Sequence, residues 1–142
     1  MPISMSAPDF LDTNVLVYAY DRVDRSKQLA AQKLVAAALN GAAAISVQVL
    51  AELSVTLLHK ASPPLRPEQM TVVLDAIAAI PLVTPDCEMV QRAVEARAEY
   101  GIHFYDGMII AAAERAGCAR IWSEDLNPGQ KYFGILVANP FA

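Results

Sequence analysis

The sequence is poor in cysteine, in aromatic residues and in charge. Its two cysteines, Cys87 and Cys118, lie far apart without the close spacing of a zinc site, and their apolar neighbours favour buried thiols over a disulfide. Charged residues make up only 18% of the 142 and aromatic residues 7%, whereas 55% are hydrophobic. This balance excludes a disordered chain and predicts one globular domain with an alanine-rich, helical interior.

Long hydrophobic runs and an excess of positive charge are also missing. The run from Met108 to Ala113 is far shorter than the roughly 18 residues that cross a bilayer, and the N-terminus lacks a basic start before a cleavable apolar stretch. We therefore expect a soluble, cytoplasmic protein. The net charge of −4 argues against a surface coated with nucleic-acid-binding charge. Any nucleic acid would have to be held by a local basic patch or by bound metal ions.

Short apolar strands alternate with helices along the chain after a loose leader over residues 1–7. Strands are predicted at 9–12, 43–46, 80–83, 119–122 and 135–138, and helices at 14–20, 24–40, 47–60, from 67, at 84–101 and at 105–116. Asp24 or Ser26 is expected to cap the second helix, and Thr84 the fifth. The alternation predicts a single α/β domain over 8–142, with a parallel sheet covered by helices on both faces.

Three aspartates fall at one edge of this predicted sheet. Asp12 closes the first strand, Asp125 lies just beyond the fourth, and Asp106 starts the helix that precedes the fourth strand. Ligands of such sheets gather outside the carboxyl ends of the strands. Each aspartate alone is better explained as a helix cap or a turn residue, but the convergence of all three favours a site.

A group of acids at one point needs a positive partner. Two carboxylates about 4 Å apart repel each other by roughly 4 kcal/mol at an effective dielectric constant of 20, so they bind a cation or take up protons. Neither His59 nor His103 has a metal-ligand partner at helical spacing, and we assign them no role. An all-carboxylate set favours Mg²⁺, or Mn²⁺ as its substitute, over zinc.

Glu52 is a weaker candidate from spacing alone. It shares a helix stripe with Gln48 and Thr56, and this stripe is equally consistent with a face turned toward water.

Four sequence blocks carry a family resemblance over nearly the whole length. They are FLDTNVLVYAYD at 10–21, QVLAEL at 48–53, FYDGMIIAAA at 104–113 and WSEDLNPGQ at 122–130, followed by a terminal NPF. In this order the chain resembles the PIN-domain ribonucleases, and most closely the VapC-type toxins of bacterial toxin–antitoxin pairs. The resemblance implies an α/β/α sandwich with a central parallel sheet. It also implies a catalytic acidic quartet of Asp12, Glu52, Asp106 and Asp125, with Asp12, Asp106 and Asp125 as metal ligands.

The resemblance further implies supporting residues around the quartet. Asn14 would orient Asp12, and Ser123 would reach the metal shell or the scissile phosphate. Glu124 is an extra acid beside Asp125, but adjacent residues seldom point the same way, so we favour Asp125 alone.

Two positions depart from the family pattern without removing a ligand. Gly107 stands where relatives often carry alanine or serine, and we expect it to loosen the helix that positions Asp106. Ala51 stands where many relatives carry asparagine.

The function implied is a Mg²⁺- or Mn²⁺-dependent endoribonuclease that leaves a 5′-phosphate and a 3′-hydroxyl. Its substrate would be a tRNA loop or an mRNA, its partner a cognate antitoxin, and its assembly a homodimer. Arg22, Arg25 and Lys27 are candidate phosphate contacts, although each is also explained as a solvated helix start.

Two other classes of protein compete with a nuclease. A receiver-type signalling domain also gathers acids at a sheet edge, but it needs a lysine just past a late strand. Here Glu124 and Asp125 follow Trp122, and Lys131 lies too far along. The second is a catalytically silent, partner-binding domain, whose signature would be loss of an acid, and all four are present.

Overall fold

The computed structural model describes residues 7–142, so residues 1–6 of the predicted leader lie outside it. Strands and helices alternate as expected. The strands are β1 (Asp9–Leu11), β2 (Ala43–Ser46), β3 (Leu82–Val83), β4 (Arg120–Trp122), β5 (Lys131–Tyr132) and β6 (Ile135–Ala138). The helices are α1 (Thr13–Tyr20), α2 (Arg25–Leu39), α3 (Val47–Val55), η1 (Thr56–Lys60), α4 (Pro67–Ala76), α5 (Cys87–Tyr100) and α6 (Phe104–Arg115). Across 7–142, no helix combines the length and the apolar character that a membrane crossing requires.

The predicted parallel sheet is confirmed. Its strand order is β3-β2-β1-β4-β6-β5, and every pair is parallel except β5 with β6. The chain leaves β1 for β2 on one side, and β4 pairs with β1 on the other side, so strand order reverses beside β1. A reversal of this kind opens a crevice at the carboxyl ends of the strands.

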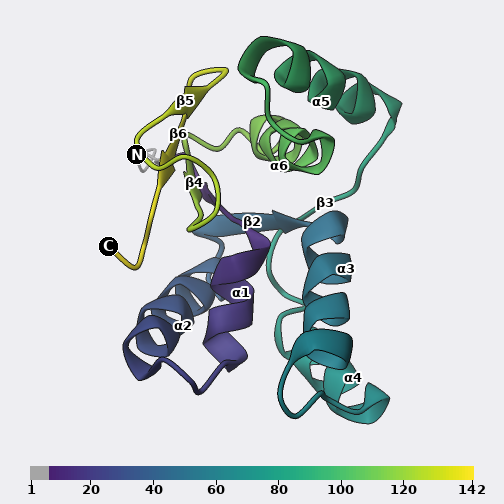
Figure 1. Cartoon of the computed structure of the whole chain (residues 1–142), viewed down its shortest axis with the longest axis vertical. Helices are drawn as coiled ribbons and strands as arrows, with labels where there is room; N and C mark the ends of the chain where they lie inside the picture. The colour runs from purple at the N-terminus through teal and green to yellow at the C-terminus, as the bar shows by residue number, and fades with distance from the viewer. Residues whose placement is uncertain (1–6) are drawn as a thin grey trace, which may run out of the picture.

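Helices cover both faces of the sheet. Figure 1 shows α5 and α6 on one side of the strands, and α1 and α2 on the other, with α3 beside α1 and α4 beside the α3–η1 segment. The core includes Phe10 and Ile121 from adjacent central strands, both with no exposed surface. Helix α6 is buried from Gly107 to Ala113, which explains its run of small and apolar residues.

Gly107 permits the close contact of α5 with α6. A Cβ at position 107 would lie 2.7 Å from the carbonyl oxygen of Ala93 on α5, too close for any side chain. The glycine therefore allows two helix backbones to touch, and our expectation that it loosens α6 missed this packing role.

Strand β5 was not predicted, because it is only two residues long and contains one exposed lysine, Lys131, beside the buried Tyr132. It forms an antiparallel hairpin with β6 through Phe133 and Gly134, whose φ angles are 49° and 82°. The pairing depends on this turn and on tertiary contacts rather than on an apolar run.

The helix expected over 47–60 has the predicted ends, but it changes type along its length: the α-helix ends at Val55, and residues 56–60 form a π-helical turn. The predicted start of α5 was wrong. Asp86, not Thr84, caps α5, because its carboxylate accepts the Met89 N–H at 3.0 Å. Helix α6 begins at Phe104, where His103 is the capping residue.

One cysteine also departs from expectation. Both thiols are free, as predicted, and Cys118 is buried, but Cys87 is exposed because it occupies the first position of α5.

Candidate active site

Asp12 and Ser123 lie side by side at the carboxyl ends of β1 and β4. The Asp12 N–H bonds the Trp122 carbonyl at 3.0 Å, which continues the ladder, and the Ser123 hydroxyl donates to Oδ2 of Asp12 at 2.7 Å. The other oxygen, Oδ1, accepts the Thr13 N–H at 2.8 Å and caps α1. Asp12 is therefore a helix cap and a buried carboxylate at the same time, and the two explanations do not compete.

Asn14, in the first turn of α1, joins the ends of the site. Its amide nitrogen lies 3.4 Å from Oδ2 of Asp12, 3.3 Å from Oγ of Ser123 and 3.2 Å from Oδ2 of Asp125. Its amide oxygen accepts the backbone N–H of Glu124 at 3.0 Å. One amide thus fixes the loop after β4 against the end of β1.

Glu52 faces the site rather than bulk water alone. The hydroxyl of Thr13 donates to its Oε2 at 2.7 Å, and the amide of Gln48 donates to its Oε1 at 2.8 Å. The same amide lies 3.1 Å from the Tyr105 carbonyl, at the start of α6. Glu52 is therefore linked to both Asp12-bearing and Asp106-bearing segments.

Asp106 lies in the first turn of α6 and is half-buried, but it does not cap the helix. Partial burial raises the pKa of its carboxyl, as do the charges of Glu52 and Asp125, while His103 opposes the shift. Asp106 therefore lies close enough to Glu52 and Asp125, which belong to distant segments, for their charges to affect its ionisation.

Burial raises the pKa of Asp12 to about 6, because its carboxylate is almost completely removed from water. The hydrogen bonds from Ser123 and Thr13 lower the pKa, whereas the charges of Glu52 and Asp125 raise it. Across residues 7–142, no salt bridge involves any member of the predicted quartet. The four acids form a negatively charged region without a protein cation paired to it.

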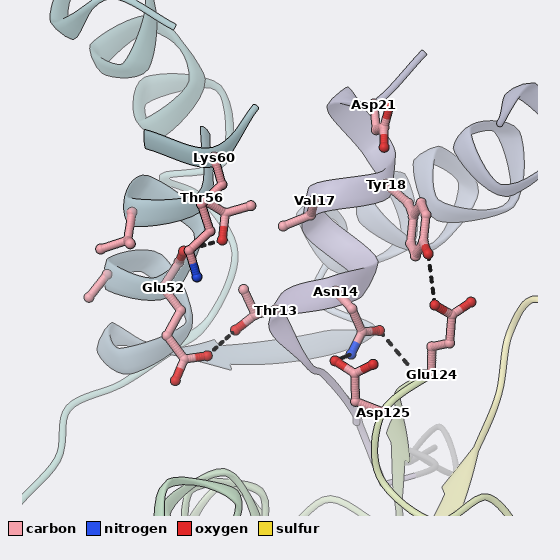
Figure 2. A pocket seen from close by; sticks show the side chains of 12 residues that line it. Thr13, Asn14, Val17, Tyr18, Asp21, Glu52, Thr56, Lys60, Glu124 and Asp125 are labelled. Carbon is pink, nitrogen blue, oxygen red and sulfur yellow. Dashed lines mark hydrogen bonds between the residues drawn. The ribbon is translucent and has the colours of Figure 1, made fainter. Parts of the chain in front are cut away.

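A pocket of about 600 Å³ opens beside these acids, between α1 and the α3–η1 segment. Its wall includes Glu52, Asp125, Asn14 and Thr13 near the sheet, with Lys60 further along (Figure 2). The pocket gives solvent and ligands access to Glu52 and Asp125, whereas Asp12 and Asp106 are not among the residues that line it.

Glu124 points away from the other acids, as predicted. Its carboxylate accepts the Tyr18 hydroxyl at 2.7 Å and the Lys27 ammonium at 2.6 Å (Figure 2 shows the tyrosine contact). The ammonium and the hydroxyl both lower the pKa of Glu124. Lys27 also lies 4.8 Å from the centre of the Tyr18 ring. We call this set of Lys27, Glu124 and Tyr18 the α2–loop clasp. Because Lys27 is paired with Glu124, this candidate phosphate contact is already engaged within the protein.

The remaining predicted phosphate contacts differ from one another. Arg25 donates to Gln28 on its own helix at 2.6 Å, and Arg22 is exposed in the segment between α1 and α2. Neither is among the residues that line the pocket.

Sequence reasoning overlooked Thr13, Gln48 and Tyr18. Thr13 could have been found, because it stands between Asp12 and Asn14 at the end of the first strand. The contacts of Gln48 and Tyr18 join segments more than 50 residues apart, and no local pattern reveals them.

The donor chemistry of this region fits a hard divalent cation. All four acids offer negatively charged carboxylate oxygens, which are hard ligands, and none offers a sulfur or an imidazole nitrogen. Within the described part of the chain, no three Asp, Glu, His or Cys side chains are already placed to hold one metal ion together. Mg²⁺ keeps several waters and commonly uses only one or two carboxylates plus substrate phosphates, so a spread set of acids is compatible with it.

A model of the PIN-domain family matches residues 10–133, and the chain therefore belongs to that family. This confirms the family resemblance and sets aside the receiver-type alternative. No curated protein matches the sequence.

Solved structures of similar fold come from toxin–antitoxin systems. A toxin–antitoxin complex from Klebsiella pneumoniae has a TM-score of 0.67 at 19% identity, covering 93% of this chain and 97% of that chain. VapBC2 from Rickettsia felis, bound to a promoter DNA fragment, has a TM-score of 0.65 at 22% identity, covering 92% and 97%. VapC20 from Mycobacterium tuberculosis, described as a sarcin–ricin loop cleaving toxin, has a TM-score of 0.64 at 17% identity, covering 82% and 89%.

Proposed function

We propose that this protein is a Mg²⁺-dependent endoribonuclease, with Mn²⁺ as a substitute, and the toxin of a toxin–antitoxin pair. One observation carries the metal-dependent part of this proposal. The Asp12 carboxylate is buried without a cationic partner, and the charges of Glu52 and Asp125 raise its pKa further. A protein keeps such an arrangement at a cost in stability, which is typical of a site that awaits a cation.

In this proposal Asp12, Asp106 and Asp125 are the candidate metal ligands, of which Mg²⁺ needs only one or two beside its waters and the substrate phosphate, and Glu52 is the fourth catalytic acid. A bound Mg²⁺ would neutralise charge on the scissile phosphate and activate a water for hydrolysis. Asn14 keeps the carboxylates of Asp12 and Asp125 in a fixed relation through its two hydrogen bonds.

Two further residues hold carboxylates of this site in place. The hydroxyl of Ser123 donates a hydrogen bond to Oδ2 of Asp12, and the hydroxyl of Thr13 donates one to Oε2 of Glu52. Asp12 and Glu52 are thus oriented before substrate arrives, which favours catalysis.

The proposed substrate is RNA, either a tRNA loop or an mRNA. Support comes from membership of the PIN-domain family and from the similar fold of VapC20, described as cleaving the sarcin–ricin loop. Metal ions at the carboxylates would lessen the repulsion between this negatively charged protein and RNA.

The proposed partner is an antitoxin that closes the acidic pocket with a basic side chain. Similar folds occur in toxin–antitoxin complexes, which supports such a partner, and a homodimer of the toxin belongs to the same proposal. A protein that co-purifies at fixed stoichiometry and suppresses RNA cleavage would support it. A stoichiometric partner that leaves cleavage unchanged would contradict it.

The test of the catalytic proposal compares the wild type with Asp106→Asn for RNA cleavage in Mg²⁺, in Mn²⁺ and in EDTA. Asp75→Asn is the matched control, because Asp75 is exposed on α4, away from the pocket. We expect cleavage by the wild type and the control in either metal, and loss of cleavage with Asp106→Asn or EDTA. Cleavage that survives chelation or Asp106→Asn contradicts the mechanism, and an inactive wild type favours the catalytically silent, partner-binding alternative.

A further inference from the structure

Lys60 is the basic side chain among the residues that line the 600 Å³ pocket. The other charged residues of its wall are acids: Asp21, Glu52, Glu124 and Asp125. In the described part of the chain, Lys60 enters no salt bridge, whereas the nearby Lys27 is held by Glu124. One ammonium group in this pocket is therefore available for a ligand.

The π-helical turn places Lys60 on the side of the helix that carries Glu52. Eight residues cover about 2.2 turns of an α-helix, which would rotate residue 60 by about 80° away from residue 52. The turn over residues 56–60 is wider, closed by the Ala61 N–H to the Thr56 carbonyl at 2.9 Å, and it reduces this rotation. Turns of this type occur frequently at functional sites.

Figure 2 shows the result of this geometry. The Lys60 side chain runs back along the helix toward Glu52, with its amino group beside Thr56 and facing the pocket. No salt bridge joins Lys60 to Glu52 among residues 7–142, so the ammonium group and the carboxylate are not in direct contact. The ammonium group of Lys60 therefore lies beside the acidic residues without forming an ion pair with them.

We propose that Lys60 binds a backbone phosphate of a single-stranded RNA, next to the phosphate that is cut. This inference rests on the proposed function, because it takes RNA as the substrate. A net charge of −4 gives the protein no general attraction for a polyanion, so a single lysine at the pocket has a large share in holding the strand. Lys60 is a substrate-positioning residue in this proposal, and it takes no part in the chemical step.

The test measures binding of a short fluorescein-labelled single-stranded RNA by anisotropy, in EDTA and at a series of salt concentrations. EDTA prevents metal-dependent cleavage, so binding is read separately from catalysis. Lys60→Ala should weaken binding roughly tenfold, as for loss of one charge-assisted contact. It should also reduce the slope of log K against log salt by about 0.7, the value for one phosphate contact on a single strand.

Three variants complete the design. Lys60→Arg should retain the salt slope, Lys60→Met should behave as Lys60→Ala, and Lys33→Ala is the control, since Lys33 is an exposed lysine on α2 outside the pocket. In Mg²⁺, Lys60→Ala should raise KM for RNA and leave kcat within about twofold, which a loss of fold would not do.

Each result supports or contradicts the proposal. An unchanged salt slope in Lys60→Ala overturns it, as does an equal loss in Lys33→Ala or an absence of RNA binding by the wild type at low salt. Weaker binding of a co-purifying protein, without any change toward RNA, would assign Lys60 to a protein contact instead. Failure of the proposed function itself shows differently, as cleavage that survives EDTA or Asp106→Asn.

Discussion

The ammonium group of Lys27 lies 2.6 Å from a carboxylate oxygen of Glu124 and joins helix α2 to the loop after β4. That loop carries Asp125, and the backbone N–H of Glu124 also bonds Asn14 at 3.0 Å. The α2–loop clasp therefore holds the side chain of Glu124 while Asn14 holds the backbone of the same residue. The negative charge of Glu124 is therefore neutralised by Lys27 and does not add to that of the four acids, and the same ion pair helps to position the loop that carries Asp125.

Lys27→Met should lower kcat for RNA cleavage, by roughly tenfold to a hundredfold, because small misplacements of a catalytic group have effects of this size. The melting temperature should change little, since the pair is partly exposed. Arg115→Met removes a comparable pair with Asp86 on α5 and serves as the control that keeps its activity. Equal kcat values for the two variants would show that the clasp does not position the site.

Asp12 should make folding stability fall as pH rises. The pKa of its carboxyl is raised by burial to about 6 in the folded state, from an ordinary value near 3.8. Its contribution to stability is therefore fully present below about pH 4, and it is lost as pH rises through 6. The loss is about 3 kcal/mol at most.

Chemical denaturation from pH 4 to 7.5 in EDTA measures this loss. Asp12→Asn has no carboxyl to titrate and should flatten the dependence, while Asp75→Asn should retain it. A wild type and an Asp12→Asn variant with the same dependence on pH would contradict the assignment.

Gly107→Ala should destabilise the protein by about 1 to 3 kcal/mol, because the added Cβ meets the Ala93 carbonyl oxygen at 2.7 Å. The sign of the change in unfolding free energy distinguishes two roles for Gly107. If Gly107 only loosened α6, alanine would raise the unfolding free energy by about 1 kcal/mol through its higher helix propensity. Thermal or urea unfolding of the variant decides between the two, and any stabilisation rules out the close-packing role.

The sequence predicted the parallel sheet and most helices because alternating apolar strands and helix caps are local patterns. It placed Asp12 and Asp125 at one edge because both follow strands. It missed the π-helical turn at residues 56–60 and the strand β5, since neither has a distinctive residue pattern. Both depend on packing between distant segments.

The candidate site divides in the same way. Asp12, Asp106 and Asp125 were proposed from topology, and Glu52 mainly through family resemblance. The partners that orient Glu52 are Thr13 of α1 and Gln48 of its own helix: the stripe shared with Gln48 was visible in the sequence, whereas the contact with Thr13, 39 residues away, was not predicted. The orientation of Lys60 likewise follows from the π-helical turn rather than from spacing.

The central claim is that the acidic quartet holds a divalent metal, and a thermal shift with Mn²⁺ tests it most directly. At about a hundredfold excess over its Kd, the ion should stabilise the wild type by about 2.7 kcal/mol, or roughly 5 to 10 °C in Tm. The account predicts this shift in the wild type and in Asp75→Asn, and its loss in Asp106→Asn. Equal shifts in all three proteins, or no shift in the wild type, would contradict it.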